Sequence, residues 1–392
     1  MQNSKPFMVF IGHGTREELR ALPHAGPPWG GEIGPWRRRA LDDGAGERLV
    51  QDHPEGYSAN PELAEAVNTA IILGKPLLLT GRPGTGKSQL ADRVAWEFNL
   101  SPVLRFEAQS MSEAQDLFYR YDLVAQLGAV EMLKAGAAVQ NLKQGGTADL
   151  RPELPDTNPR RFITFGPLGE AILRASPRGN ENLLDVAVPA QVSSAQPQPQ
   201  PQPRPSVVLI DEIDKASRDF PNDLLNGIER LEFRIRELQD HTIVAPDDPG
   251  FRPIVIITSN SERDLPDAFL RRCIYYHIKD PDKDVLRKIL LARVFPLNSG
   301  GPPAVERGQV YEDLLDFFVE YRDHHGEQMH YRSGTSELID WARALKRDTE
   351  LQPEGTLADN RRPLQRTLGS VAKHREDRKL LDDALANWGA AS

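Results

Sequence analysis

Five short runs of aliphatic residues constrain the fold of this 392-residue chain more than any other feature. Their apolar residues follow one another without the alternation of a half-exposed strand, and helical patterns lie between the runs. Such runs are typical of parallel strands that helices cover on both faces, so we predict an α/β fold with a five-stranded parallel sheet. The runs are PLLLT (76–80), VLRF (103–106), VVLI (207–210), IVIIT (254–258) and CIYYHI (273–278).

The rest of the chain divides into an arm before the sheet and helices after it. Residues 1–56 show no helical or alternating period, so we expect an irregular N-terminal arm that lies on the following domain. The α/β core is expected over 57–280, where Asn60 can cap the first helix and Pro61 fits its first position. Residues 281–392 predict a small all-helical domain that includes a C-terminal helix. Its helical patterns open at Asp280 and Pro281 and recur near 310–323, 335–347 and 363–388.

The gap between the second and third runs is longer than the roughly 30 residues of a strand-helix-strand unit. We therefore expect an insertion over about 110–205. Within it, residues 112–135 have helical character, and PRRFITFGPLGEAI (159–172) indicates a strand or hairpin that leads into a helix. The Gln-Pro ladder of residues 196–205 cannot pack a core, and we interpret it as a solvated polyproline spacer rather than a recognition motif.

Composition favours a cytoplasmic protein without a membrane span. No apolar run approaches the roughly 20 residues that a transmembrane helix needs, and the N-terminal stretch is too short in its apolar part for a signal peptide. The single cysteine, Cys273, excludes internal disulfides and agrees with a reducing compartment. The net charge of −9 argues against a whole-surface nucleic-acid binder but leaves a local basic groove possible.

The segment GRPGTGKS, residues 81–88, follows the first predicted strand and opens a helix whose buried face is marked by Leu90, Val94 and Phe98. It fits the phosphate-binding pattern of Gly, four residues, then Gly-Lys-Ser. In such a loop backbone amides turn toward the β- and γ-phosphates, Lys87 reaches the phosphate oxygens, and Ser88 ligates Mg²⁺. The expected nucleotide contacts are Pro83, Gly84, Thr85, Gly86, Lys87, Ser88 and Gln89.

Two adjacent carboxylates, Asp211 and Glu212, end the third aliphatic run. A buried strand gains nothing from carboxylates at its tip unless they face a cation or a reacting water. We predict that Asp211 holds magnesium and its waters together with Ser88. Glu212, one residue further on, is predicted to orient the attacking water or to accept its proton.

Two other segments carry candidate catalytic residues, each with an ordinary structural alternative. Asn260, after the fourth run, could hydrogen-bond the attacking water or the γ-phosphate, or it could be a common turn residue. Arg271 and Arg272, before the fifth run, could include an arginine finger that enters a neighbouring subunit's site, or they could favour a helix dipole.

Three histidines, His324, His325 and His330, lie close together in DHHGEQMH. They have no carboxylate-histidine pair at helical spacing with a matching ligand elsewhere, so a metal site is disfavoured. We interpret them as solvated loop histidines.

Taken together and in this order, GRPGTGKS, LIDEID, ITSN and FLRRC resemble an AAA+ ATPase, and the resemblance covers roughly residues 57–350. FGPLGEAI and DEIDKASRDFPNDLLNGIE resemble the MoxR branch, in which an insertion interrupts the second helix. The proline-rich LPHAGPPWG and TSNSERDLPDAFLRRC further resemble MoxR-type ATPases that bacterial conflict modules encode beside a von Willebrand factor A domain protein.

This resemblance implies a ring of about six copies in which ATP with Mg²⁺ sits between protomers and hydrolysis remodels or activates a protein partner. It implies that Lys87 and Ser88 form the first phosphate motif, Asp211 and Glu212 the second, Asn260 the first sensor, and Arg271 or Arg272 the finger. The chain departs from the family at the second-sensor arginine. There RSGTSELIDW offers Ser336, with Arg332 one turn earlier as the expected nucleotide contact.

The leading hypothesis is therefore Mg²⁺-dependent ATP hydrolysis that does conformational work on a protein. A nucleotide-gated assembly switch with little turnover is the alternative that this departure at the second sensor motivates. A nucleic-acid motor is disfavoured because the roughly 110 residues after the last strand are helical, where a helicase needs a second nucleotide-binding-type domain. A GTPase is disfavoured because the chain has no Asn-Lys-x-Asp segment.

Overall fold

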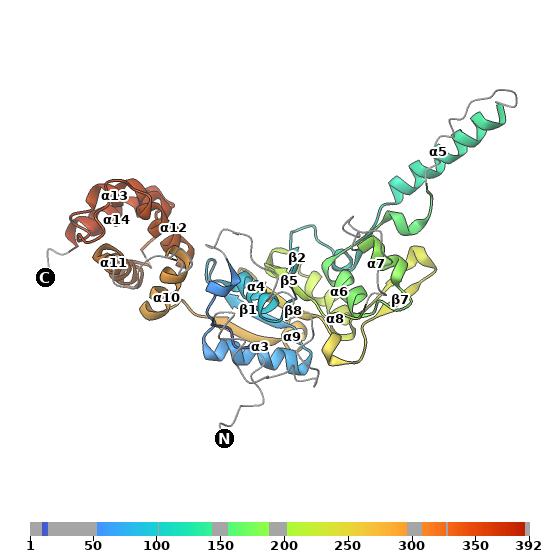
Figure 1. The fold of residues 1–392 in the computed structure, drawn as a ribbon, viewed down its shortest axis with the longest axis horizontal. Coiled ribbons are helices and arrows are strands. Elements are labelled where there is room, and N and C mark those ends of the chain that lie inside the picture. The colour runs from blue at the N-terminus through green and yellow to red at the C-terminus, as the bar shows by residue number, and fades with distance from the viewer. Residues whose placement is uncertain are drawn as a thin grey trace, which may run out of the picture.

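The computed structural model describes residues 10–14, 53–100, 102–142, 156–187, 202–295, 308–326 and 328–388 (Figure 1). Its centre is a five-stranded sheet in the order β2-β5-β8-β1-β9, with every neighbouring pair parallel. The predicted parallel sheet is therefore confirmed. The strands are β1 (Leu77–Gly81), β2 (Leu104–Glu107), β5 (Val207–Asp211), β8 (Ile254–Ser259) and β9 (Ile274–Ile278).

Helices bury both faces of this sheet. Leu77 and Leu79 of β1 pack into one core cluster with α3 (Pro61–Leu73) and α4 (Lys87–Glu97), whereas Leu78 packs into another on the opposite face. Successive side chains of a strand point to opposite faces, so a strand covered on both sides must be apolar throughout. This explains why the runs do not alternate. The second face is covered by α6 (Pro167–Ala175), α7 (Glu181–Ala187) and α8 (Phe220–Arg230).

The helix signals read from the sequence at the start of the core are confirmed. Asn60 is the N-cap of α3, its side chain accepts a hydrogen bond from the Leu63 backbone N–H at 2.7 Å, and Pro61 is the first helical residue. Leu90 and Val94 of α4 are fully buried, and Phe98 follows them as the C-cap.

The insertion differs from the sequence prediction. The expected helix over 112–135 is wrong at its start, where a 3-10 turn (η3, Ala114–Leu117) leads into the strand β3 (Tyr119–Tyr121). β3 pairs antiparallel with β4 (Ile163–Phe165). The ring of Tyr119 is buried and lies 6.2 Å from that of Phe233, so tertiary packing prevails over the local helical pattern. The predicted strand before a helix at 159–172 is confirmed by β4 and α6.

A long helix, α5 (Leu123–Leu142), follows β3 and extends away from the rest of the molecule (Figure 1). A second hairpin that the sequence did not indicate joins β6 (Glu232–Ile235) to β7 (His241–Val244). Most of the Gln-Pro ladder, residues 196–201, lies outside the described residues.

The helices after the sheet share a core of their own at the end of the molecule opposite α5 (Figure 1). Fully buried Trp341 lies at the centre of that core, with Phe317 packed edge-on to its ring. The expected helix at 363–388 is interrupted by the turn η10 (Leu368–Ser370), and the first helix starts at Lys283, capped by Asp282, rather than at Asp280. The helices are α10 (Lys283–Val294), α11 (Gln309–His325), α12 (Thr335–Lys346), α13 (Arg361–Thr367) and α14 (Arg375–Asn387).

None of the described helices combines the length and the apolar character that crossing a bilayer requires.

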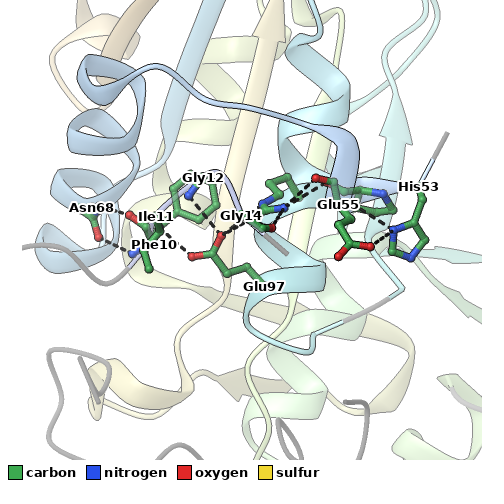
Figure 2. Close-up of polar contacts among 10 residues, drawn as sticks. Phe10, Ile11, Gly12, Gly14, His53, Glu55, Asn68 and Glu97 are labelled. Atoms are coloured by element: carbon green, nitrogen blue, oxygen red, sulfur yellow. Dashed lines mark hydrogen bonds and ion pairs between the residues drawn. The ribbon is translucent and has the colours of Figure 1, made fainter. Parts of the chain in front are cut away.

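The described residues of the N-terminal segment are held by buried polar groups of α3 and α4 (Figure 2). Phe10 has no exposed surface, and its backbone N–H and C=O both hydrogen-bond the side chain of Asn68, at 2.8 and 2.9 Å. The carboxylate of Glu97 accepts from the N–H groups of Ile11 and Gly12, at 2.7 and 3.2 Å. Residues 10–14 are therefore fixed against the core.

Replacing Asn68 with alanine should lower the free energy of unfolding by about 1–3 kcal/mol, because the buried N–H of Phe10 loses its acceptor. Urea-induced unfolding measures this change. Thr69→Ala is the matched control, since the Thr69 hydroxyl is exposed and bonds only within its helix. It should change stability by less than about 0.5 kcal/mol. Equal losses in the two variants would contradict the anchoring role of Asn68.

Candidate nucleotide-binding site

The loop between β1 and α4 has a backbone that only glycine adopts without strain. Gly81, Gly84 and Gly86 have φ of 147°, 77° and 87°. A Cβ on Gly81 would lie 2.6 Å from the carbonyl oxygen of Ile278, and one on Gly84 would lie 2.5 Å from the Ser336 hydroxyl. Of the two glycines that the phosphate-binding pattern requires, Gly81 and Gly86, Gly81 is therefore also imposed by close packing, and the backbone angles favour glycine at both. Within the loop, the Thr85 hydroxyl donates to the Arg82 carbonyl at 2.8 Å.

Lys87, the first residue of α4, folds back over this loop. Its ammonium group donates to the carbonyl oxygens of Gly81 and Arg82 at 2.7 and 2.8 Å, and the residue is 6% exposed. Burial lowers the pKa of Lys87, while the nearby carboxylates of Asp211, Asp214 and Glu212 act in the opposite direction. A buried cation thus lies at the helix N-terminus, where phosphate oxygens bind favourably.

Ser88 and Asp211 meet although 123 residues separate them in the chain. The Ser88 hydroxyl donates to both carboxylate oxygens of Asp211, at 2.8 and 3.0 Å. A hydroxyl and a carboxylate are the hard oxygen ligands that Mg²⁺ prefers, so the residues present fit that ion.

Glu212 follows with a left-handed backbone, φ 55°. Its Oε1 accepts from the Asn260 side-chain amide at 3.0 Å, and its Oε2 is paired with the Lys215 ammonium group. The hydrogen bond from Lys215, aided by that from Asn260, keeps the pKa of Glu212 below its usual range against the opposing effect of burial. The structure therefore brings two predicted catalytic residues, Glu212 and Asn260, into contact, with the carboxylate in its charged form.

Two further residues of this site were missed in the sequence analysis. Thr258 is fully buried at the end of β8, where its hydroxyl donates to Asp211 and accepts from the Glu212 backbone N–H. Asp214 is 3% exposed and accepts from the backbone N–H groups of Asn260 and Glu262. Both lie inside segments already singled out, LIDEID and ITSN, so a polar residue within or just after each buried aliphatic run was the available signal.

The helical domain contacts the same loop. The Ser336 hydroxyl, in the first turn of α12, donates to the Gly84 carbonyl at 3.4 Å. Asp280 lies 3.6 Å from Arg82 in the loop and 3.6 Å from Arg332 before α12. The guanidinium of Arg332, expected as a nucleotide contact, thus pairs with a carboxylate that it shares with the loop.

Gln89, another expected contact, accepts a hydrogen bond from Arg293 of α10 at 3.4 Å. The ring of Tyr57 approaches from the N-terminal side, where it lies 3.2 Å from the place of a Cβ on Gly86. The start of α4 is therefore bordered by the segment before α3 and by the helical domain.

Arg271 and Arg272 lie at the amino-terminal ends of the parallel strands, opposite the carboxyl ends where the loop and the two acids meet. They precede β9, whose last residue pairs with Gly81, so about five residues, or roughly 16 Å of strand, separate them from the loop. Arg272 is tied to Glu229 at 2.9 Å and to the Ala268 carbonyl at 3.0 Å. Within the described part of the chain, the Arg271 side chain has no hydrogen-bond or ion-pair partner.

The profile of the family described as "AAA domain (dynein-related subfamily)" matches residues 76–273, which is 198 of the 392 residues and just over half of the chain. The chain belongs to this family. The matched range of this AAA domain begins before β1 and ends before β9, so it contains the phosphate-binding loop, both acids, Thr258, Asn260 and both arginines. The predicted P-loop fold is thereby confirmed, and the helices α10 to α14 confirm the predicted helical region after it.

Other comparisons add little. No curated protein sequence matched the chain. One similar solved structure is described as "Closed State CryoEM Reconstruction of Hsp104:ATPyS and FITC casein", with 17% identity and a TM-score of 0.35. The match covers 67% of this chain and only 41% of that one. A TM-score this low supports no inference about activity or partners.

Thr258→Val should destabilise the AAA domain by about 1–3 kcal/mol, because the backbone N–H of Glu212 loses its acceptor and Asp211 loses a donor. The free energy of unfolding, from urea titration, is the measurement. Thr242→Val in β7 is the matched control, because Thr242 is exposed and we expect a change within about 0.5 kcal/mol. If both variants unfold at the same urea concentration as the unmodified protein, Thr258 does not organise the two acids.

Proposed function

We propose that this protein is a MoxR-type AAA+ ATPase that binds ATP with Mg²⁺, assembles into a ring and uses hydrolysis to remodel or activate a protein partner. The observation that carries this proposal is the convergence of Lys87, Ser88, Asp211 and Glu212 at one edge of the sheet. Two parts of the sequence separated by more than a hundred residues supply them.

Each side chain has a role that its surroundings support. Lys87, buried at the start of α4, would exchange its carbonyl partners for the β- and γ-phosphate oxygens. Ser88 and Asp211 would hold Mg²⁺, which when bound neutralises charge on those oxygens. Thr258 would keep the Asp211 carboxylate oriented, since its hydroxyl donates to one carboxylate oxygen.

Glu212 is the proposed base. It is held ionised beside Asn260, so it could accept a proton from a water placed between them and the γ-phosphate. Asn260 would orient that water through its amide, as a first sensor does in the AAA+ family. Its backbone is fixed by the buried carboxylate of Asp214, which favours this role over that of an ordinary turn residue.

The separation of Arg271 and Arg272 from the site of their own chain supports a ring. An arginine at the amino-terminal ends of the strands cannot reach a phosphate bound at the loop of the same chain, but it could reach one bound by a neighbour. We propose Arg271 as the finger, because Arg272 is already occupied by Glu229. A ring of about six copies, and a partner with a von Willebrand factor A domain, are the finer expectations that follow from the resemblance to the MoxR branch.

We propose that Asp280 replaces part of the second sensor's role. It joins Arg82 of the loop to Arg332 of the helical domain. At the position of the family's second-sensor arginine, this chain has Ser336. A phosphate that attracted Arg82 or Arg332 would weaken these ion pairs, so the helical domain would respond to nucleotide through the carboxylate of Asp280.

Glu212→Gln should lower the rate of ATP hydrolysis by at least about 100-fold while ATP affinity changes little, because the amide cannot accept the proton but keeps the shape of the carboxylate. Lys87→Ala should instead lose nucleotide affinity. Phosphate release and binding of a fluorescent ATP analogue are measured with Mg²⁺ present. Glu262→Gln, on the exposed turn nearby, is the matched control and should retain activity. Equally low turnover in Glu212→Gln and in the unmodified protein would instead favour the assembly switch.

Arg271→Ala should reduce hydrolysis by about 10³-fold or more without loss of ATP binding, and Arg272→Ala should have a smaller effect. Mixing Arg271→Ala with Glu212→Gln subunits should restore part of the activity, because one supplies an intact site and the other an intact finger. Steady-state turnover of the mixture is compared with that of each variant alone. No recovery on mixing would rule out a finger supplied by a neighbour.

A further inference from the structure

The three histidines of DHHGEQMH separate in the structure. His324 and His325 lie at the end of α11, whereas His330 lies in the loop before α12 and meets His374 and Glu376 at the start of α14. The sequence offered no reason to join His330 to residues 44 and 46 positions away. All three side chains of this new cluster are exposed.

Their spacing would allow the three side chains to share one metal ion. One nitrogen of each imidazole and one oxygen of the carboxylate all lie within 4.8 Å of one another. The Glu376 Oε2 atom is 2.6 Å from His330 Nε2 and 3.5 Å from His374 Nδ1. Ligand atoms around a tetrahedral Zn²⁺ with bonds of about 2.0–2.1 Å are about 3.3 Å apart, so small side-chain rotations would suffice.

The cluster stands on a rigid base. Asp377, next to Glu376, has no exposed surface, and its two oxygens accept from the backbone N–H groups of His330 and Tyr331, both at 2.9 Å. The Ser333 hydroxyl, further along the same loop, donates to the Val371 carbonyl at 2.8 Å. The loop and the start of α14 are thus held together independently of the exposed side chains. Ligands held on such a base lose less freedom when an ion binds.

We propose that His330, His374 and Glu376 form a Zn²⁺ site on the helical domain. Two imidazoles and one carboxylate are a set of three protein ligands common for zinc, and they leave a coordination position for water or for a group from another molecule. Zinc would compete here with the close contacts of the Glu376 carboxylate to both rings. The only thiol of the chain, Cys273, is buried in the core of the sheet and takes no part.

The zinc site would also affect the helical domain, and this consequence rests on the proposed function. The loop that carries His330 continues through Arg332, which pairs with Asp280, to Gly334, where a Cβ would lie 3.3 Å from the Pro83 carbonyl oxygen. Zinc would join this loop to α14 by a second link. It would therefore stiffen the segment through which the helical domain contacts the phosphate-binding loop.

The test is a Zn²⁺ titration of the full chain by calorimetry, in millimolar Mg²⁺ so that zinc does not occupy Ser88 and Asp211. We expect one Zn²⁺ per chain, and at least about 10-fold weaker binding in His330→Ala, His374→Ala and Glu376→Gln. Co²⁺ in place of Zn²⁺ should give visible absorption bands that His374→Ala removes. His324→Ala, an exposed histidine outside the cluster, is the matched control and should bind as the unmodified protein does.

Equal affinity in His374→Ala and His324→Ala, or no saturable binding to the unmodified chain, would overturn the proposal. Lys87→Ala, which is expected to lose ATP affinity, should keep zinc binding unchanged. Zinc binding and nucleotide binding therefore succeed or fail separately.

Discussion

The contact between Ser88 and Asp211 is the interaction on which the rest of the site depends. It joins the first turn of α4 to the end of β5, although β8 lies between β5 and β1 in the sheet. Thr258 of β8 bridges that interval, because its hydroxyl bonds Asp211 and the backbone of Glu212 together. Three strand ends are thereby fixed relative to one another before any ligand is considered.

The acids at this edge would repel one another without a cation. Asp211, Glu212 and Asp214 lie within four residues of the chain, and Asp214 is almost fully buried. Lys87 and Lys215 offset part of this charge, and backbone N–H groups satisfy Asp214. Because the remaining negative charge is concentrated beside Ser88 and Asp211, a divalent cation would bind there favourably. The site therefore combines a cation position with a neighbouring anion position at the start of α4.

The sheet and the start of the site could be predicted from the sequence because their signals are local. Uninterrupted aliphatic runs mark strands buried on both faces, and GRPGTGKS fixes a loop through its glycines. The hairpin of β3 and β4 could not be predicted, since Tyr119 becomes a strand residue only when Phe233 packs against it. The link from Arg332 to Asp280 and that from His330 to His374 also join distant positions, and a single sequence gives no sign of such pairs.

The helix α4 connects the nucleotide-binding site to the N-terminal segment. Its first residues form the site, while Arg93 and Glu97 at its other end are completely buried as an ion pair. Arg93 also donates to the carbonyls of Gly14 and Glu55. Two segments that are about 40 residues apart in the chain are therefore bound to one helix. A buried pair stabilises only when its remaining hydrogen-bonding capacity is satisfied, and here the N-terminal backbone does this. Removing residues 10–14 would therefore destabilise the C-terminal end of α4, the helix whose first turn holds Lys87 and Ser88. The N-terminal segment is in this sense a structural part of the AAA domain.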